Sequence, residues 1–278
     1  MHHAITVFGT DYCMHPAELA PEIESRGFES VWVAEHSHIP ASRTSPWPGG
    51  PELPQFYYDA MDPFVWLSAA ASVTKTLKLA TGICLVVQRD PIQTAKQVAS
   101  LDRLSKGRFI FGVGAGWNIE EMNNHGTQGE GRFKLLRERI EAMKEIWTQE
   151  EASYEGEHVS FDRIIANPKP VQQPHPPIHV GGGFPGGARR AVRYGNGWIP
   201  IGGRDGIDFT EHVADLRKAA EQAGRNPDEM EVSIFAAPPE KDFVERCEAA
   251  GVSRITFGIP PAGPDVLLPW LDNLVGLR

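Results

Sequence analysis

The chain has 278 residues, which is normal for one α/β barrel and long for most other single domains. Its formal net charge is −9, and no basic run is long enough to supply the positive surface that a nucleic acid needs. Three scattered cysteines without a C-x-x-C pair indicate neither a disulfide framework nor a zinc site. Because we find no leader-like start and no apolar run of membrane-spanning length, we expect one domain over residues 1–278, located in the cytoplasm without a membrane partner.

Apolar runs bounded by turn residues predict eight strands. In chain order they begin at Ala4, Ser30, Lys78, Arg108, Pro177, Gly197, Met230 and Arg254. A helical pattern follows each strand; the first, over 15–27, carries Leu19 and Ile23 four residues apart and ends at Gly27. Eight strand–helix units in one chain favour an α/β fold of the (β/α)₈ TIM-barrel type over an open sheet.

The second predicted strand ends in Glu35, His36 and His38, which a barrel would place at its C-terminal mouth, where active sites lie. A histidine there can donate or accept a proton near neutral pH. Two alternatives remain: a metal pair formed by His36 and His38, or a histidine that only caps a turn. The ends of the later strands are poor in metal ligands, which argues against the metal pair.

Two stretches interrupt the alternation of strands and helices. Residues 40–61 are rich in proline and aromatic side chains, whereas residues 150–176 are polar and then proline-rich. We expect both to be loop excursions at the C-terminal mouth, because long loops of this kind usually serve a binding site. The aromatic residues of the first loop either cover an apolar substrate or attach the loop to the barrel, and the sequence does not decide between these roles.

The third and fourth predicted strands end in small and apolar residues, in the segments GICLVV and GVGAGW. These ends predict a floor and a wall for a wide, flat ligand, with Trp117 in contact with it. The alternative is that the small residues only pack the barrel interior, and for Gly112 we favour that packing role.

A glycine-rich turn follows the fifth predicted strand. Gly181, Gly182 and Gly183 would allow backbone amides to approach a ligand closely, and the helix beginning near Pro185 would direct its unpaired N–H groups to the same point. This pattern predicts a phosphate site, although glycine could also serve the turn alone.

The same glycines match the G-x-G-x-x-G fingerprint of Rossmann domains, with Asp205 roughly 20 residues further on. In a Rossmann half the fingerprint opens the first unit, whereas here four strand–helix units precede it. The Rossmann fold therefore remains the minor alternative.

Three segments, residues 27–40, 78–122 and 176–200, resemble the bacterial luciferase-like flavin and deazaflavin enzymes. The resemblance is closest to the branch of coenzyme F420-dependent oxidoreductases and extends from about Pro16 to Gly203. It implies a TIM barrel with the cofactor ring at the C-terminal mouth. It also implies a homodimer.

The resemblance further implies which residues form the site. Glu35 and His36 would lie against the ring, and a cis peptide bond at Gly82–Ile83 would support it. The remaining cofactor-binding residues would be Ala115, Gly116, Trp117 and Asn118 after the fourth strand, and Gly181, Gly182, Gly183, Gly187 and Ala188 around the phosphate. Trp117 stands where sugar-phosphate dehydrogenases of this family have a catalytic glutamate, so we expect His36 to act as the acid or base, oriented by Glu35.

Together these features predict an F420-dependent oxidoreductase that transfers a hydride between the deazaflavin and a small organic substrate, without a metal. The alternative cofactor is FMN, in a luciferase-like monooxygenase. A non-catalytic barrel that only binds a flavin or deazaflavin is the alternative from another class of protein.

Overall fold

The computed structural model describes residues 1–202 and 209–277, and parallel strands close into a barrel within these ranges. The strands of the ring are β1 (His2–Val7), β2 (Ser30–Val33), β3 (Lys78–Thr81), β5 (Phe109–Gly114), β8 (Ile178–Gly181), β9 (Gly197–Ile199), β10 (Glu231–Ile234) and β11 (Arg254–Gly258). Each pairs in parallel with the next, and β11 pairs with β1 to close the ring. A short strand, β4 (Cys84–Leu85), resumes after β3 and pairs with β5.

The eight strands of the ring confirm the predicted (β/α)₈ TIM barrel, and each predicted strand corresponds to one strand of the ring. A closed ring is not the open sheet of a Rossmann domain, so the glycine fingerprint has a different setting here. Asp205, the acidic residue of that alternative, lies outside the described residues.

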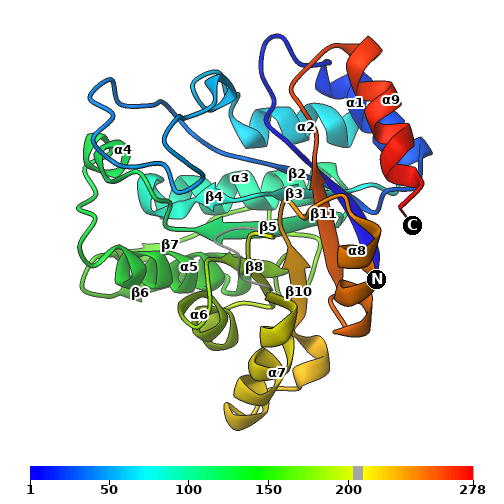
Figure 1. Cartoon of the computed structure of the whole chain (residues 1–278). Helices are drawn as coiled ribbons and strands as arrows, with labels where there is room; N and C mark the ends of the chain where they lie inside the picture. Colours follow the sequence, from blue (N-terminus) through cyan, green and yellow to red (C-terminus); the bar gives the residue numbers. More distant parts are fainter. Residues whose placement is uncertain (203–208, 278) are drawn as a thin grey trace.

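Helices surround the barrel (Figure 1). They are α1 (Pro16–Ser25), α2 (Pro63–Val73), α3 (Pro91–Leu104), α4 (Ile119–Asn124), α5 (Arg132–Thr148), α6 (Gly186–Tyr194), α7 (Val213–Gln222), α8 (Lys241–Ala249) and α9 (Pro264–Val275). Two of them, α2 and α3, begin with proline in the first turn after an aspartate. The carboxylates of Asp62 and Asp90 accept hydrogen bonds from backbone N–H groups of the first turns of α2 and α3.

Only the first of the two excursions behaves as predicted. Residues 40–61 form a loop with one 3₁₀ turn, Gln55–Tyr57, and contribute to the mouth of the barrel. The second excursion instead contains an antiparallel hairpin, β6 (Ala152–Glu155) and β7 (Ser160–Ile164), which packs along α5. Its last part lies at the amino ends of the strands, where the Gln172 amide donates to the carbonyl of Phe109. The expectation that it lies at the mouth is therefore corrected, since a segment between a helix and the next strand must return to the amino ends.

Large side chains fill the barrel below the mouth. Trp32 and Ile110 are buried among the small residues Ala4 and Ala80. A Cβ atom on Gly112 would lie 2.0 Å from the carbonyl oxygen of Thr81, so Gly112 is required by packing, as predicted. Because the interior is filled at this level, a ligand can enter only above it, at the carboxyl ends of the strands.

The buried His179 on β8 predicts a loss of stability in mild acid. Its side chain is 1% exposed, and burial lowers its pKa to about 4, although the nearby Glu231 carboxylate opposes this shift. Between pH 6.5 and 4 the unfolded chain therefore binds a proton at this residue that the folded chain does not, so stability falls as pH falls. The expected loss by pH 4 is roughly 3 kcal/mol.

Urea unfolding at a series of pH values would measure this loss. A His179→Gln variant should show a smaller dependence of unfolding free energy on pH across that window. An unchanged slope in the variant would assign the acid sensitivity to other groups.

Candidate functional site

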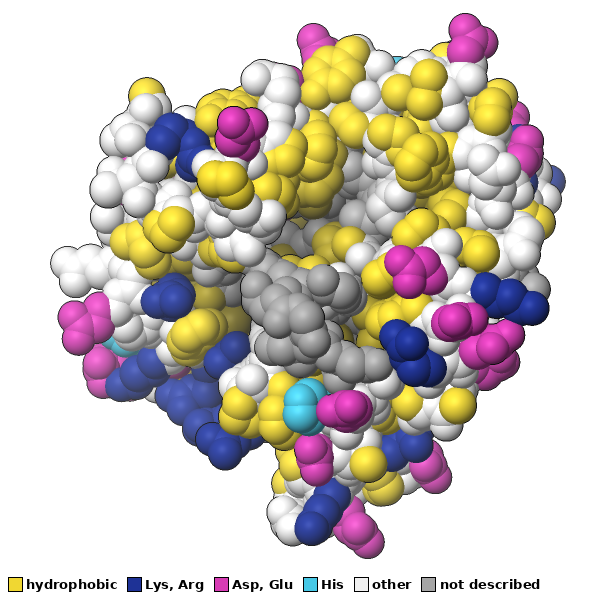
Figure 2. Space-filling view, viewed as in Figure 1, with side chains coloured by type: hydrophobic (Ala, Val, Ile, Leu, Met, Phe, Trp, Pro, Cys, Tyr) yellow, Lys and Arg dark blue, Asp and Glu magenta, His cyan; other side chains and the backbone are white. Residues whose placement is uncertain are grey.

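A cavity of about 340 Å³ opens at the carboxyl ends of the strands. Its lining combines strand ends with the first loop excursion, which contributes Trp47, Pro48 and Tyr57. Figure 2 shows hydrophobic side chains gathered around a hollow on this face of the molecule. Of the predicted site residues, those that line the cavity are Glu35, His36, Gly82, Ile83, Ala115, Gly116, Trp117, Gly181, Gly182 and Gly183.

The other three predicted residues support the wall of the cavity. The Asn118 side chain is 1% exposed and caps α4 by accepting from the backbone N–H of Glu121. Gly187 and Ala188 lie in the first turn of α6 and are buried. The structure thus places the predicted site residues at one end of the barrel. Most of them line the cavity, and Asn118, Gly187 and Ala188 lie behind the lining.

His36 has a buried carboxylate partner, and that partner is Glu121. The Nδ1 atom of His36 lies 2.8 Å from Oε2 of Glu121, whose side chain is completely buried. An ionised carboxylate only accepts hydrogen bonds, so Nδ1 carries the proton and donates it. The remaining ring nitrogen, Nε2, is then the one that a ligand in the cavity can meet.

Hydrogen bonds keep Glu121 ionised despite its burial. Burial by itself raises the pKa of this carboxyl group, but the bonds from His36 and from the backbone N–H of Ser37 outweigh it, and the pKa lies below its ordinary value. The Glu121 carboxylate therefore fixes both the tautomer and the orientation of the His36 ring.

The expectation that Glu35 orients His36 is corrected by these contacts. The Glu35 carboxylate accepts hydrogen bonds of 2.6 Å from the backbone N–H of Leu85 and from Nε of Arg89. It therefore holds the segment after β3 in place rather than the His36 ring. Sequence reasoning missed Glu121, although an acidic helix start directly after the predicted fourth strand was a usable signal.

The side chain of Ile83 lies on the floor of the cavity. The peptide bond between Gly82 and Ile83 is cis, as the family resemblance implied. A Cβ atom on Gly114 would lie 2.0 Å from Cδ1 of Ile83, and one on Gly181 would lie 3.1 Å from it. The glycines of β5 and β8 thus leave the space that Ile83 occupies, and the floor beneath a ligand is apolar.

The glycine turn and α6 form one compact unit. Gly182 has φ +129°, a backbone conformation that favours glycine, and its carbonyl accepts a hydrogen bond of 2.7 Å from Trp198 Nε1. A Cβ atom on Gly187 would lie 2.2 Å from the same carbonyl oxygen. Glycine at these two positions is therefore required for the turn to approach the helix.

Arg190 of α6 brings a positive charge to this turn. Its NH2 atom lies 2.9 Å from the position that a Cβ atom on Gly182 would take, and its guanidinium lies over the Phe133 ring at 4.0 Å. Within the described residues its Nε atom is buried without a hydrogen-bond partner. Burial lowers the pKa of Arg190, yet an arginine stays protonated, so the turn offers a cation and backbone amides to an anion.

The described residues give the metal-pair alternative no support. His38 bonds to Ser37 and Asn124 rather than converging with His36 on one point. In residues 1–202 and 209–277 no group of His, Cys, Asp and Glu side chains is arranged to hold a metal ion. The same ranges contain no helix with the length and apolar character that a membrane crossing requires.

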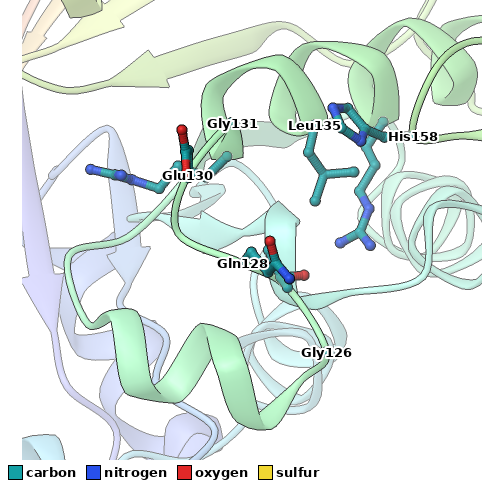
Figure 3. Close-up of a pocket in the computed structure, with 9 residues that line it drawn as sticks. Gly126, Gln128, Glu130, Gly131, Leu135 and His158 are labelled. Carbon is teal, nitrogen blue, oxygen red and sulfur yellow. The ribbon is translucent and has the colours of Figure 1, made fainter.

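A second cavity, of about 320 Å³, lies between the start of α5 and the tip of the hairpin (Figure 3). Its lining includes Gln128, Glu130, Leu135 and His158. These residues come from the outside of the barrel and do not include the strand ends. We place the candidate site in the first cavity, which collects His36, Arg190 and the glycine turn.

Comparison with known proteins shows what the chain is similar to in sequence and in fold. The model of the luciferase-like monooxygenase family matches residues 13–240. An uncharacterised protein of Mycobacterium tuberculosis is 40% identical over 279 residues, with 99% of this chain and 97% of that protein covered. The F420-dependent glucose-6-phosphate dehydrogenase of Kineococcus radiotolerans is 30% identical over 225 residues, with coverages of 78% and 61%. The crystal structure of a Streptomyces bottropensis monooxygenase has the same fold, with a TM-score of 0.79 at 21% identity and coverages of 99% and 98%.

Proposed function

The chain belongs to the luciferase-like monooxygenase family, and from this premise we propose that it is an F420-dependent oxidoreductase acting on a small organic substrate. The observation that carries the proposal is the arrangement of one cavity. A histidine with a fixed tautomer faces it, and a glycine turn with a half-buried arginine borders it. The similarity to an F420-dependent dehydrogenase supports the choice of cofactor.

The residues of the cavity fit a deazaflavin with a phosphate-bearing side chain. Ile83 and the segment Ala115–Trp117 would contact the ring, while Arg190 and the glycine turn at 181–183 would hold the phosphate. When bound, the deazaflavin supplies the ring carbon that accepts or donates a hydride.

The protein's own contribution is orientation and proton transfer. Nε2 of His36 would take a proton from the substrate, or return one to it, while Glu121 stabilises the imidazolium that forms. Tyr57 and Trp117 pack near the His36 ring, with centroid distances of 5.2 and 5.8 Å. Together with Trp47 of the first loop they limit the access of water to the reacting atoms.

An FMN-dependent monooxygenase is the second candidate, because the same apolar floor and phosphate cradle suit a flavin and because the fold is shared with a monooxygenase. A barrel that only carries the cofactor is the third, and it would bind without turnover. We further propose, from the family resemblance, that the chain acts as a homodimer in the cytoplasm.

Titration of the purified protein with F420 and, separately, with FMN tests the proposal through quenching of ligand fluorescence. We expect F420 to bind more tightly than FMN. The opposite preference would favour the monooxygenase, and the absence of binding by either ligand would contradict the assignment of the site.

The same titration tests the role of Arg190. An Arg190→Gln variant should bind F420 about 10- to 150-fold more weakly, since one hydrogen-bonded charge pair contributes about 1.5–3 kcal/mol. Arg189→Gln is the matched control, because Arg189 lies one position earlier on the same helix, is exposed and carries the same charge. Equal losses of F420 affinity in both variants would show that the effect comes from net charge rather than from the position of Arg190 at the glycine turn.

A further inference from the structure

The buried His36–Glu121 pair is connected to the surface by a chain of polar groups. The backbone N–H of Ser37 donates to Oε1 of Glu121 at 3.0 Å, and the Ser37 hydroxyl lies 3.4 Å from the same oxygen. That hydroxyl also lies 2.6 Å from Nε2 of His125 and 2.9 Å from Nδ1 of His38. Since Ser37 and His125 are exposed while Glu121 is completely buried, Ser37 is the point where this chain meets solvent.

We propose that Ser37, His38 and His125 form a proton relay that links the buried Glu121–His36 pair to bulk water. Its use in turnover rests on the proposed function, in which His36 must exchange a proton in every cycle. His36 is itself only 8% exposed, and a ligand in the cavity would cover its inner side. A route through the opposite side of the ring would allow the proton to leave while the ligand stays in place.

The hydrogen bonds define the direction of the relay. The amide nitrogen of Asn124 only donates, so Nε2 of His38 accepts its hydrogen bond of 2.9 Å and Nδ1 of His38 carries a proton. Nδ1 of His38 therefore donates to the Ser37 oxygen, and the Ser37 hydroxyl donates to Nε2 of His125. His125 is thus the proton acceptor of the relay, and the hydrogen bond from His38 keeps the Ser37 hydroxyl directed toward it.

Each step moves one proton, and the outward sequence leaves His36 with its proton on Nε2 instead of Nδ1. When Nε2 later releases that proton, the reverse sequence returns one to Nδ1 and restores the resting state. A proton gained by His36 at Nε2 releases the one at Nδ1 to Oε2 of Glu121. The neutral carboxyl group then rotates so that the same proton faces the Ser37 oxygen and passes to it, while the Ser37 hydroxyl passes its own proton to His125. His125 finally loses that proton to water, and no oxidant or further reactant is needed.

The neighbouring charged groups are engaged elsewhere. Glu120 accepts from the hydroxyls of Ser42 and Thr44 and from the backbone N–H of Ser45. Glu35 is paired with Arg89. In the part of the chain that the structure describes, the Glu121 carboxylate therefore reaches solvent through Ser37.

Solvent exchange of the His36 Nδ1 proton tests the relay without any cofactor or substrate. In ¹⁵N-histidine-labelled full-length protein, the exchange rate of this proton with water can be measured by NMR saturation transfer. Ser37→Val and Ser37→Thr are matched variants, because both side chains have the same branched shape and only threonine keeps the hydroxyl. The backbone N–H that holds Glu121 is retained in both.

We expect the valine variant to exchange this proton about tenfold or more slowly than the threonine variant and the wild type. Persistence of the Nδ1 proton signal in both variants would show that the His36–Glu121 bond is intact. Equal exchange rates in the two variants would overturn the relay. Because the measurement needs no F420, its failure would leave the proposed function untouched, and a failed F420 titration would leave the relay standing.

Discussion

Replacing His36 with glutamine should lower turnover by about 10²- to 10⁴-fold, which is the usual contribution of a positioned acid or base. Glutamine cannot exchange a proton at the position of Nε2, but it is polar and similar in size. F420 binding, measured by titration, should therefore stay close to that of the wild type. Hydride transfer would be followed by deazaflavin fluorescence, with the first substrate that a screen of small alcohols and carbonyl compounds identifies.

Glu35→Gln is the control for this prediction. Glu35 bonds to Leu85 and Arg89 rather than to His36, so its substitution should lower the melting temperature through the segment after β3. The His36 variant should also lose stability, because it removes a donor to the buried Glu121 carboxylate, so turnover rather than melting temperature separates the two variants. A His36→Gln variant with full turnover would contradict the assignment of His36 as the acid or base, whatever the behaviour of the Glu35 variant.

Replacing Gly187 with alanine should destabilise the protein by about 1–3 kcal/mol, the usual cost of overpacking. The new Cβ atom would lie 2.2 Å from the carbonyl oxygen of Gly182 and 2.8 Å from Nε1 of Trp198. The nearer atom belongs to the backbone and cannot rotate away, so the whole turn must shift. We therefore expect weaker F420 binding together with lower stability, measured by urea unfolding without ligand and by titration.

Gly183→Ala separates the effect of the turn from that of any added methyl group. No atom lies within 4 Å of a Cβ built on Gly183, so this variant should keep the stability of the wild type. Equal destabilisation by both substitutions would show that the tight contact between Gly187 and Gly182 is not what the turn depends on.

Much of the phosphate site, formed by the glycine turn and the start of α6, was predictable from local sequence. The choice between similar side chains within it was not. The first turn of the helix after the glycines carries two adjacent arginines, Arg189 and Arg190, which the sequence does not distinguish. The rotation of α6 decides that Arg190 packs over Phe133 and faces the cavity while Arg189 is exposed. The hairpin β6–β7 escaped prediction for a related reason: its polar strands are held by α5, for example by the bond from Tyr154 to Glu141.

The sequence by itself determined the order of the eight strand–helix units and the strand ends and first loop that form the mouth, but it wrongly placed residues 150–176 there. Apolar runs, prolines in first helical turns and glycines in tight turns act within a few residues, so their consequences can be inferred without a structure. Only the tertiary structure decided which carboxylate serves His36. Glu35 is its neighbour in the chain, but adjacent residues of an extended segment point to opposite sides. Glu121, 85 positions away, reaches His36 because the segments after β2 and β5 meet at the same mouth of the barrel, with only β3 between those strands.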